Sequence, residues 1–176
     1  MKKFLAISAA AGFFAFFAAV FLALGADWYR NKRAPDQPIA FSHKIHVGKV
    51  GLKCETCHKY THQSTFAGIP SVQKCMSCHA QVATDRPEVQ KLSGYWERQE
   101  PIPWNRVHRI RIREHVFFSH KRHMKADVDP KLECANCHGE VQYVDKLRRV
   151  SSLEMGWCVS CHVSKGASTD CLTCHR

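Results

Sequence analysis

The sequence lacks several features that mark common kinds of enzyme. It has no glycine-rich phosphate-binding loop, which argues against a nucleotide site. After residue 33 it has few periodic apolar segments, so the rest of the 176-residue chain is too poor in apolar sequence for a conventional core. Acidic residues are also scarce, with 15 Asp and Glu against 26 Lys and Arg. No cysteine lies outside one repeated pattern, which leaves none for an iron–sulfur cluster.

That pattern is a C-x-x-C pair followed directly by histidine, and it occurs five times. We number the motifs in chain order; their cysteines are Cys54 and Cys57, Cys75 and Cys78, Cys134 and Cys137, Cys158 and Cys161, and Cys171 and Cys174. The histidines that follow are His58, His79, His138, His162 and His175. C-x-x-C-H is the attachment signature of c-type haem: the two thiols add to the haem vinyl groups, and the adjacent histidine reaches the iron as proximal ligand.

Two other readings of the cysteine pairs are weaker. Structural zinc uses C-x-x-C pairs, but Cys₄ sites do not require a histidine after each pair, and five pairs make an odd number. A disulfide framework explains the even cysteine count and leaves the histidines unexplained. The sequence therefore predicts five covalently attached haems c, each with its iron.

Seven histidines remain as candidate distal ligands on the far side of each iron. His43, His46, His120 and His123 recur in a duplicated motif and are the first choice, and His108 is the fifth. His62 and His115 are expected to lie at the surface or contact propionates. Met155, three residues before Cys158, is an alternative thioether ligand, or else a buried gap-filler. These candidate ligands are numerous enough to fill the second axial position of every iron. Filled irons favour electron transfer over substrate binding, so we expect no catalytic centre in this chain.

The chain from residue 34 onward contains an internal duplication. F-S-H-K-x-H at residues 41–46 recurs at 118–123, an offset of 77, and the following motif pairs are offset by 80 and 83. We therefore divide the sequence into an anchor and flank (1–33) and a pentahaem domain (34–176). The domain consists of a first half (41–79), a link (80–117), a second half (118–162) and a terminal motif (171–175). Residues 34–40 form a short tether, and the link is predicted to hold a helix from Pro87 to about Gln99.

The N-terminal segment carries 23 consecutive uncharged residues at positions 4–26. As a helix it would span about 34 Å, enough for a hydrocarbon core of about 30 Å. Lys2 and Lys3 place its N-terminus in the cytoplasm, so the haem domain is expected in the periplasm, anchored to the inner membrane by a single pass. A cleaved signal peptide is the alternative, although the apolar run is longer than usual for one.

The basic charge is explained by the predicted haems. The net charge of +11 roughly balances the propionates of five haems, and Arg106, Arg109, Arg111 and Arg113 are candidate propionate partners. Nucleic-acid binding is not expected. The fold class that follows is mainly helical and irregular, with short helices and loops wrapped around five haems, plus one N-terminal transmembrane helix. The polypeptide without haem should be largely unfolded.

The F-S-H-x-x-H turn before C-x-x-C-H resembles class III multihaem cytochromes. AGIPSVQKCMSCH (67–79), PIPWNRVH (101–108), FSHKRH (118–123) and SLEMGWCVSCH (152–162) together resemble the membrane-anchored pentahaem subunit of bacterial alternative complex III.

That resemblance implies a relay of electrons within a quinol:electron acceptor oxidoreductase. The implied partners are an iron–sulfur and molybdopterin-oxidoreductase-like subunit and polytopic quinol-binding membrane subunits. The implied acceptor is a monohaem cytochrome c or a terminal oxidase. The alternatives are a free-standing periplasmic carrier of anaerobic respiration and, less favoured, a multihaem reductase with an open iron.

Overall fold

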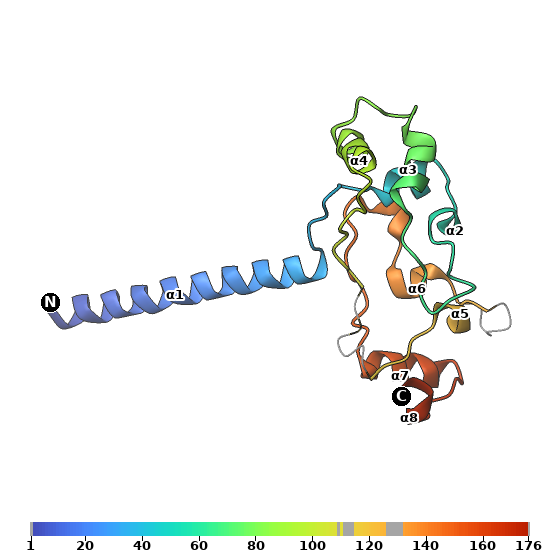
Figure 1. Cartoon of the computed structure of the whole chain (residues 1–176). Helices are drawn as coiled ribbons and strands as arrows, with labels where there is room; N and C mark the ends of the chain where they lie inside the picture. Colours follow the sequence, from blue (N-terminus) through green and yellow to red (C-terminus); the bar gives the residue numbers. More distant parts are fainter. Residues whose placement is uncertain (1, 109, 111–114, 126–131, 176) are drawn as a thin grey trace.

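The computed structural model describes residues 2–108, 110, 115–125 and 132–175. Its first element is the 32-residue helix α1 (Lys2–Arg33), which extends away from the rest of the chain (Figure 1). Residues Ile7–Tyr29 have a mean hydropathy of 2.3, and none of that stretch is buried by other parts of the protein. By length and composition, α1 is able to cross a membrane.

The remainder of the described chain consists of short helices joined by loops. They are η1 (Lys44–Lys49, a π-helix), α2 (Cys54–Cys57), α3 (Val72–His79), α4 (Pro87–Glu97), α5 (His120–His123), α6 (Cys134–His138), η2 (Val141–Tyr143, a 3₁₀ turn), α7 (Met155–Ser164) and α8 (Cys171–Cys174). The described residues contain no β-strand. The predicted mainly helical and irregular fold is confirmed.

The α3 and α4 helices form the best-packed part of the haem domain. Ser71 caps α3 by accepting a hydrogen bond from the Lys74 N–H, and α4 begins with Pro87 at its first position, as predicted from the sequence. Leu92 of α4 packs with Ile39 and Ile102 in a small apolar cluster, against which Val72, Cys75, Met76, Tyr95 and Trp104 lie.

The tether before the first half takes part in this packing. We predicted residues 34–40 only as a connection, yet Ile39 is one of the three central members of the cluster. The Ala40 N–H donates to the Glu88 carboxylate at 2.6 Å, and Gln37 pairs with the backbone of Asn105. The tether is therefore fixed on the link segment, because both its apolar and its polar groups find partners there.

The apolar core of the haem domain is otherwise very small. The buried hydrophobic side chains in the described chain are Ile39, Val89, Leu92 and Ile102, and none of the described residues is a large side chain below 2% exposure. The buried residues of the second half that the structure describes are the polar Ser119 and Ser151. The prediction of a domain without a conventional core is confirmed, and attached haems would supply the missing apolar surface.

The two halves contact each other in a reciprocal way. The Lys44 N–H of the first half donates to the Val144 carbonyl of the second at 3.1 Å, and the Lys121 N–H of the second half donates to the Ser64 carbonyl of the first at 2.9 Å. Lys44 and Lys121 occupy equivalent positions in the duplication, and Ser64 and Val144 both lie between the two attachment motifs of their own half. Such exchange of equivalent contacts is typical of a two-fold interface, here between halves of one chain.

Candidate haem-attachment sites

Each cysteine pair lies on one short helical turn. The pairs of motifs 1, 3 and 5 begin α2, α6 and α8, and those of motifs 2 and 4 lie within α3 and α7. On a helix, residues three apart share a face, so both thiols of a pair can reach one ring edge. All ten cysteines are free thiols. Among the described residues, no three or more His, Cys, Asp or Glu side chains are grouped so that they could hold a metal ion.

Four of the five proximal histidines are held by a backbone carbonyl through Nδ1. His58 donates to Gly68 at 2.6 Å, His79 to Val82 at 2.9 Å, His162 to Ser168 at 2.6 Å and His175 to His115 at 2.8 Å. This bond fixes the tautomer that carries the proton on Nδ1 and leaves the Nε2 lone pair for a metal. Orientation by a carbonyl is the usual arrangement for an imidazole that binds iron.

Three of the four candidate distal histidines of the duplicated motif show the same arrangement. His46 donates through Nδ1 to the Ser42 carbonyl and His123 to the Ser119 carbonyl, each at 2.9 Å and each four residues back along the chain. His120 donates to the Thr65 carbonyl at 3.0 Å. The equivalence of His46 and His123 in the sequence therefore extends to their hydrogen bonds.

Three pairs of imidazoles lie at the separation that an iron between them would require. Two imidazoles on opposite sides of one iron have ring centres roughly 6 Å apart, since each metal–nitrogen bond is about 2 Å long and the ring centre lies about 1 Å behind the nitrogen. The observed separations are 5.9 Å for His46 and His79, 6.0 Å for His123 and His162, and 6.4 Å for His120 and His138. The donor sets present thus fit haem iron.

Two further candidate ligands, His43 and His108, are more deeply placed. Burial lowers the pKa of each to about 4, with His58 adding to the effect at His43 and His138 at His108. Both imidazoles are therefore neutral near pH 7, the form that binds metals. His43 Nδ1 and His108 Nε2 are buried without a hydrogen-bond partner in the polypeptide. A buried nitrogen without a partner is rare, and a bound group is one explanation for it.

His108 differs from His120 in its relation to His138. Its ring centre lies only 4.3 Å from that of His138, with the rings nearly perpendicular, so no iron fits between this pair. The burial of His138 lowers its pKa as well. Motif 3 thus has two candidate distal histidines nearby, and only His120 has the required separation.

The remaining candidates from the sequence lie in exposed positions. His62 has its Nδ1 on the Met124 carbonyl at 3.0 Å and its Nε2 3.6 Å from the Glu55 carboxylate, so both its nitrogens face polypeptide partners. His115 is exposed, and its backbone carbonyl holds His175. Met155 is 67% exposed at the start of α7.

The arginines proposed for the propionates are only partly placed. The Arg106 guanidinium lies 5.8 Å from the centre of the Phe66 ring. Arg109, Arg111 and Arg113 lie outside the described residues.

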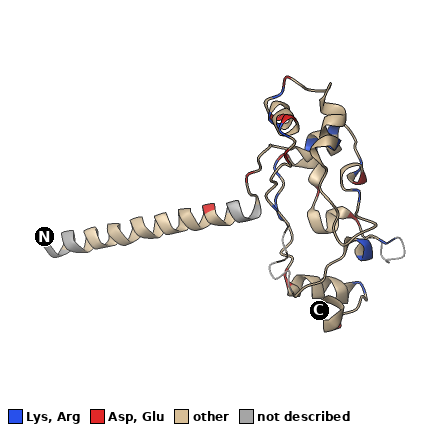
Figure 2. Cartoon of the chain, viewed as in Figure 1, with Lys and Arg blue, Asp and Glu red and all other residues tan. Residues whose placement is uncertain are grey.

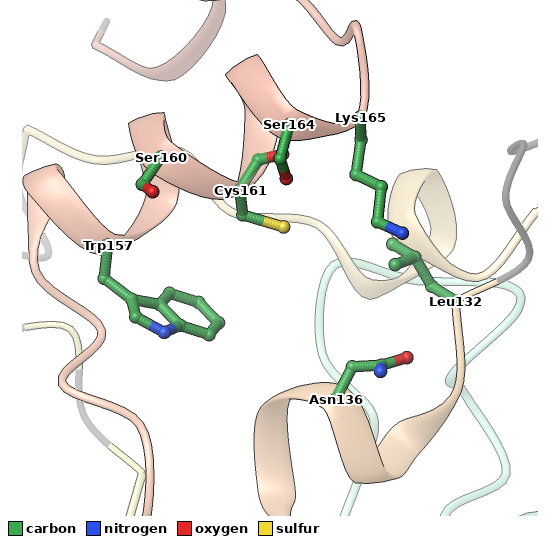
Figure 3. A pocket seen from close by; sticks show the side chains of 7 residues that line it. All are labelled: Leu132, Asn136, Trp157, Ser160, Cys161, Ser164 and Lys165. Atoms are coloured by element: carbon green, nitrogen blue, oxygen red, sulfur yellow. The ribbon is translucent and has the colours of Figure 1, made fainter.

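A cavity of about 290 Å³ separates motifs 3 and 4 (Figure 3). It is lined by Leu132, Asn136, Trp157, Ser160, Cys161, Ser164 and Lys165. Figure 3 shows the Cys161 thiol directed into this space, with Asn136 of α6 across from it. A haem-attachment thiol at an open cavity is where a large apolar group can be accommodated.

Comparison with known proteins assigns both halves to cytochrome families. Residues 26–103 match the class III cytochrome c family, and residues 116–176 match cytochrome c7 and related cytochromes c. Both families attach haem through cysteine pairs of the kind found here. The chain is a multihaem c-type cytochrome. Its ten cysteines therefore serve multiple covalently bound haems.

One relative aligns with this cytochrome over most of its length. The cytochrome shares 29% identity with the multiheme cytochrome c subunit of a menaquinone reductase from Nitratidesulfovibrio vulgaris. The alignment covers 92% of this cytochrome and 89% of the relative. The similarity thus extends over nearly the whole of both chains.

Proposed function

We propose that this cytochrome carries five haems c and relays electrons within a quinone-linked complex of the cytoplasmic membrane. The observation that carries the proposal is the set of five attachment motifs on helical turns, with imidazole pairs at the spacing of bis-histidine iron. A bound haem would supply a one-electron redox centre at each motif. The polypeptide would attach each haem, orient its axial ligands and fix the spacing between centres.

The geometry supports a specific set of axial ligands for the first four motifs. The pairs are His46 with His79, His120 with His138 and His123 with His162. The duplication then assigns His43 to His58, because His43 is equivalent to His120. For the motif at His175, Met155 is the remaining candidate from the sequence, because His108 lies beside His138 of motif 3.

Six-coordinate iron at every motif makes this subunit a relay. An iron with both axial positions filled has no open site for substrate, so the reaction with quinone belongs to other subunits. Low-spin spectra for all five haems support the relay. A high-spin ferric signal, or ligand binding to one reduced haem, would favour the multihaem reductase instead.

The helix α1 is proposed as an uncleaved anchor. An isolated helix with its apolar side chains exposed is costly in water and favourable in lipid. Lys2 and Lys3 at its start place the N-terminus in the cytoplasm and the haem domain in the periplasm. This topology agrees with haem attachment to c-type cytochromes outside the cytoplasm.

Two kinds of quinone-linked complex are supported by different observations. The PIPWNRVH and MGWCVSCH segments resemble the pentahaem subunit of alternative complex III, which oxidises quinol. In such a complex the partners are an iron–sulfur and molybdopterin-oxidoreductase-like subunit, polytopic quinol-binding subunits, and a monohaem cytochrome c or oxidase as acceptor. The relative belongs to a menaquinone reductase, in which electrons flow in the opposite direction. Our first choice is the quinol-oxidising complex.

Purification from membranes tests the proposal. The full chain, extracted in mild detergent, should travel with polytopic and iron–sulfur subunits and show five haems by intact mass. Added menaquinol should reduce its haems; if only a reduced periplasmic cytochrome does so and menaquinone then reoxidises them, the menaquinone reductase is correct. If the full chain runs alone, it is a free-standing carrier and the assignment to a complex fails. A variant lacking residues 1–33 behind a cleavable signal serves as the unanchored control.

A further inference from the structure

We propose that the five motifs lie in space as one unbranched file in the order 2–1–3–4–5, with motifs 2 and 5 at its ends. The first motif of each half then occupies the interior of the file. This inference rests on the five-haem assignment above and adds the spatial order and the terminal positions. Figure 1 shows the helices that bear the motifs in this succession, from α3 through α2 and α6 to α7 and α8.

The duplicated F-S-H-x-x-H turn sets which motifs are neighbours within each half. In the second half, α5 carries both His120, at 6.4 Å from His138, and His123, at 6.0 Å from His162. Two ligands within one helical turn can serve only adjacent irons, so motifs 3 and 4 are neighbours.

The first half repeats this arrangement. His46 lies 5.9 Å from His79, and His43 lies three residues before His46 and close to His58. The Cys57 thiol, which belongs to motif 1, also lies near enough to Cys75 of motif 2 to add to the burial effect that raises the pKa of Cys75. Motifs 1 and 2 are therefore neighbours.

Motifs 1 and 3 join the two halves. The reciprocal bonds from Lys44 to Val144 and from Lys121 to Ser64 align the halves head to head. At this contact the Cys54 and Cys134 thiols, which are equivalent in the duplication, lie close enough for Cys54 to affect the pKa of Cys134. Burial and the Cys54 thiol together raise the pKa of Cys134 to about 11. A two-fold contact brings equivalent residues together, so the two first motifs meet.

Motif 4 connects motif 3 with motif 5. The cavity of Figure 3 lies between Asn136 of motif 3 and Cys161 of motif 4. Beyond it, His162 is held by the Ser168 carbonyl, and the Ser168 hydroxyl lies 3.2 Å from that of Thr173 in motif 5. Burial raises the pKa of the Cys158 thiol, and the nearby thiols of Cys174 in motif 5 and of Cys161 add to this effect. Motif 5 thus extends the file beyond motif 4.

The spatial order differs from the chain order because the halves meet through their first motifs. A chain that simply laid one motif after another would place motif 1 at an end and motif 2 next to motif 3. The head-to-head contact exchanges these two positions. Motif 2 then lies on the α3–α4 unit, where the tether that follows α1 is packed.

Iron positions in the holo-protein test the order directly. In a cryo-electron microscopy map of the full chain within its purified complex, the iron of motif 1 should have two near neighbours, those of motifs 2 and 3. The iron of motif 2 should have one. A map with motif 1 at an end, or with motif 2 adjacent to motif 3, would overturn the inference. Fewer than five haems would instead contradict the proposed function.

A matched pair of variants tests the consequence for electron transfer. The variant Cys54→Ala/Cys57→Ala lacks the haem of motif 1. In this variant the haem of motif 2 should exchange electrons with the haems of motifs 3, 4 and 5 at least tenfold more slowly than in the unaltered protein, as measured by exchange NMR in partly reduced protein. In Cys75→Ala/Cys78→Ala, the four remaining haems should still exchange as one set. The opposite pattern refutes the order, and the map decides it if either variant fails to accumulate.

Discussion

The two halves of the haem domain have the same motifs but different support from the polypeptide. The first half packs through Val72, Cys75 and Met76 against the cluster of Ile39, Leu92 and Ile102. In the described part of the second half, no hydrophobic side chain is buried. A segment without its own core must gain stability elsewhere, and the haems proposed at motifs 3, 4 and 5 would be the available source. The comparison teaches that attached haem would form the main structural core of the second half, whereas the first half also packs on apolar side chains.

Removing a haem from the second half should have a different effect on proteolytic sensitivity from removing one from the first half, and this is the largest difference that we expect. In Cys158→Ala/Cys161→Ala, α7 loses its haem contacts and residues 132–175 should become sensitive to limited proteolysis. In Cys75→Ala/Cys78→Ala, the α3–α4 unit keeps its apolar cluster and residues 70–104 should stay resistant. Fragment masses identify the cleaved region. Equal sensitivity of the two regions would remove the distinction between the halves.

Truncating the centre of the apolar cluster should weaken the first half. Leu92 is 5% exposed, and Leu92→Ala should lower the free energy of unfolding by about 2–5 kcal/mol, through lost burial and a residual cavity. Val82→Ala, at an exposed site of the link, is the control and should change stability by less than about 0.5 kcal/mol. Denaturant unfolding followed by circular dichroism measures both, and equal effects would show that the cluster does not support this region.

The contact between the halves should be sensitive at Gly48. A Cβ atom there would collide with the Gln142 carbonyl of the second half, so Gly48→Ala should cost about 1–3 kcal/mol. Gly156 of α7 has open space where a Cβ would lie, and Gly156→Ala should be neutral or slightly stabilising. Thermal unfolding of the two holo-variants compares them. A neutral Gly48→Ala would mean that η1 and η2 are not held closely together.

The smallest effect is expected at the cap of α3. Ser71→Ala removes the hydrogen bond from the Lys74 N–H at 3.2 Å and should cost about 1 kcal/mol. Ser77→Ala, on the exposed surface of the same helix, should cost less and serves as the control. Urea titration of both variants gives the comparison, and a larger loss at Ser77 would contradict the capping role.

The sequence was sufficient for features that depend on local spacing. The five attachment motifs, the helix beginning at Pro87, the apolar N-terminal helix and the lack of a conventional core were all predictable, because each depends on neighbouring residues or on composition. The role of Ile39 was missed because its partners Leu92 and Ile102 are more than 50 residues away. The nearness of His108 to His138 was also unpredictable, since no periodic pattern relates them.

The fifth motif has a consequence for how such a chain can be lengthened. Motif 5 follows the second half directly, at the end of the file farthest from the contact between the halves, and it is held by the carbonyl of His115 and by the loop at Ser168. Adding it leaves the exchange of bonds between Lys44, Val144, Lys121 and Ser64 unaltered. In the proposed file, a C-terminal extension of this kind adds one redox centre at the end and leaves the contact between the halves unchanged.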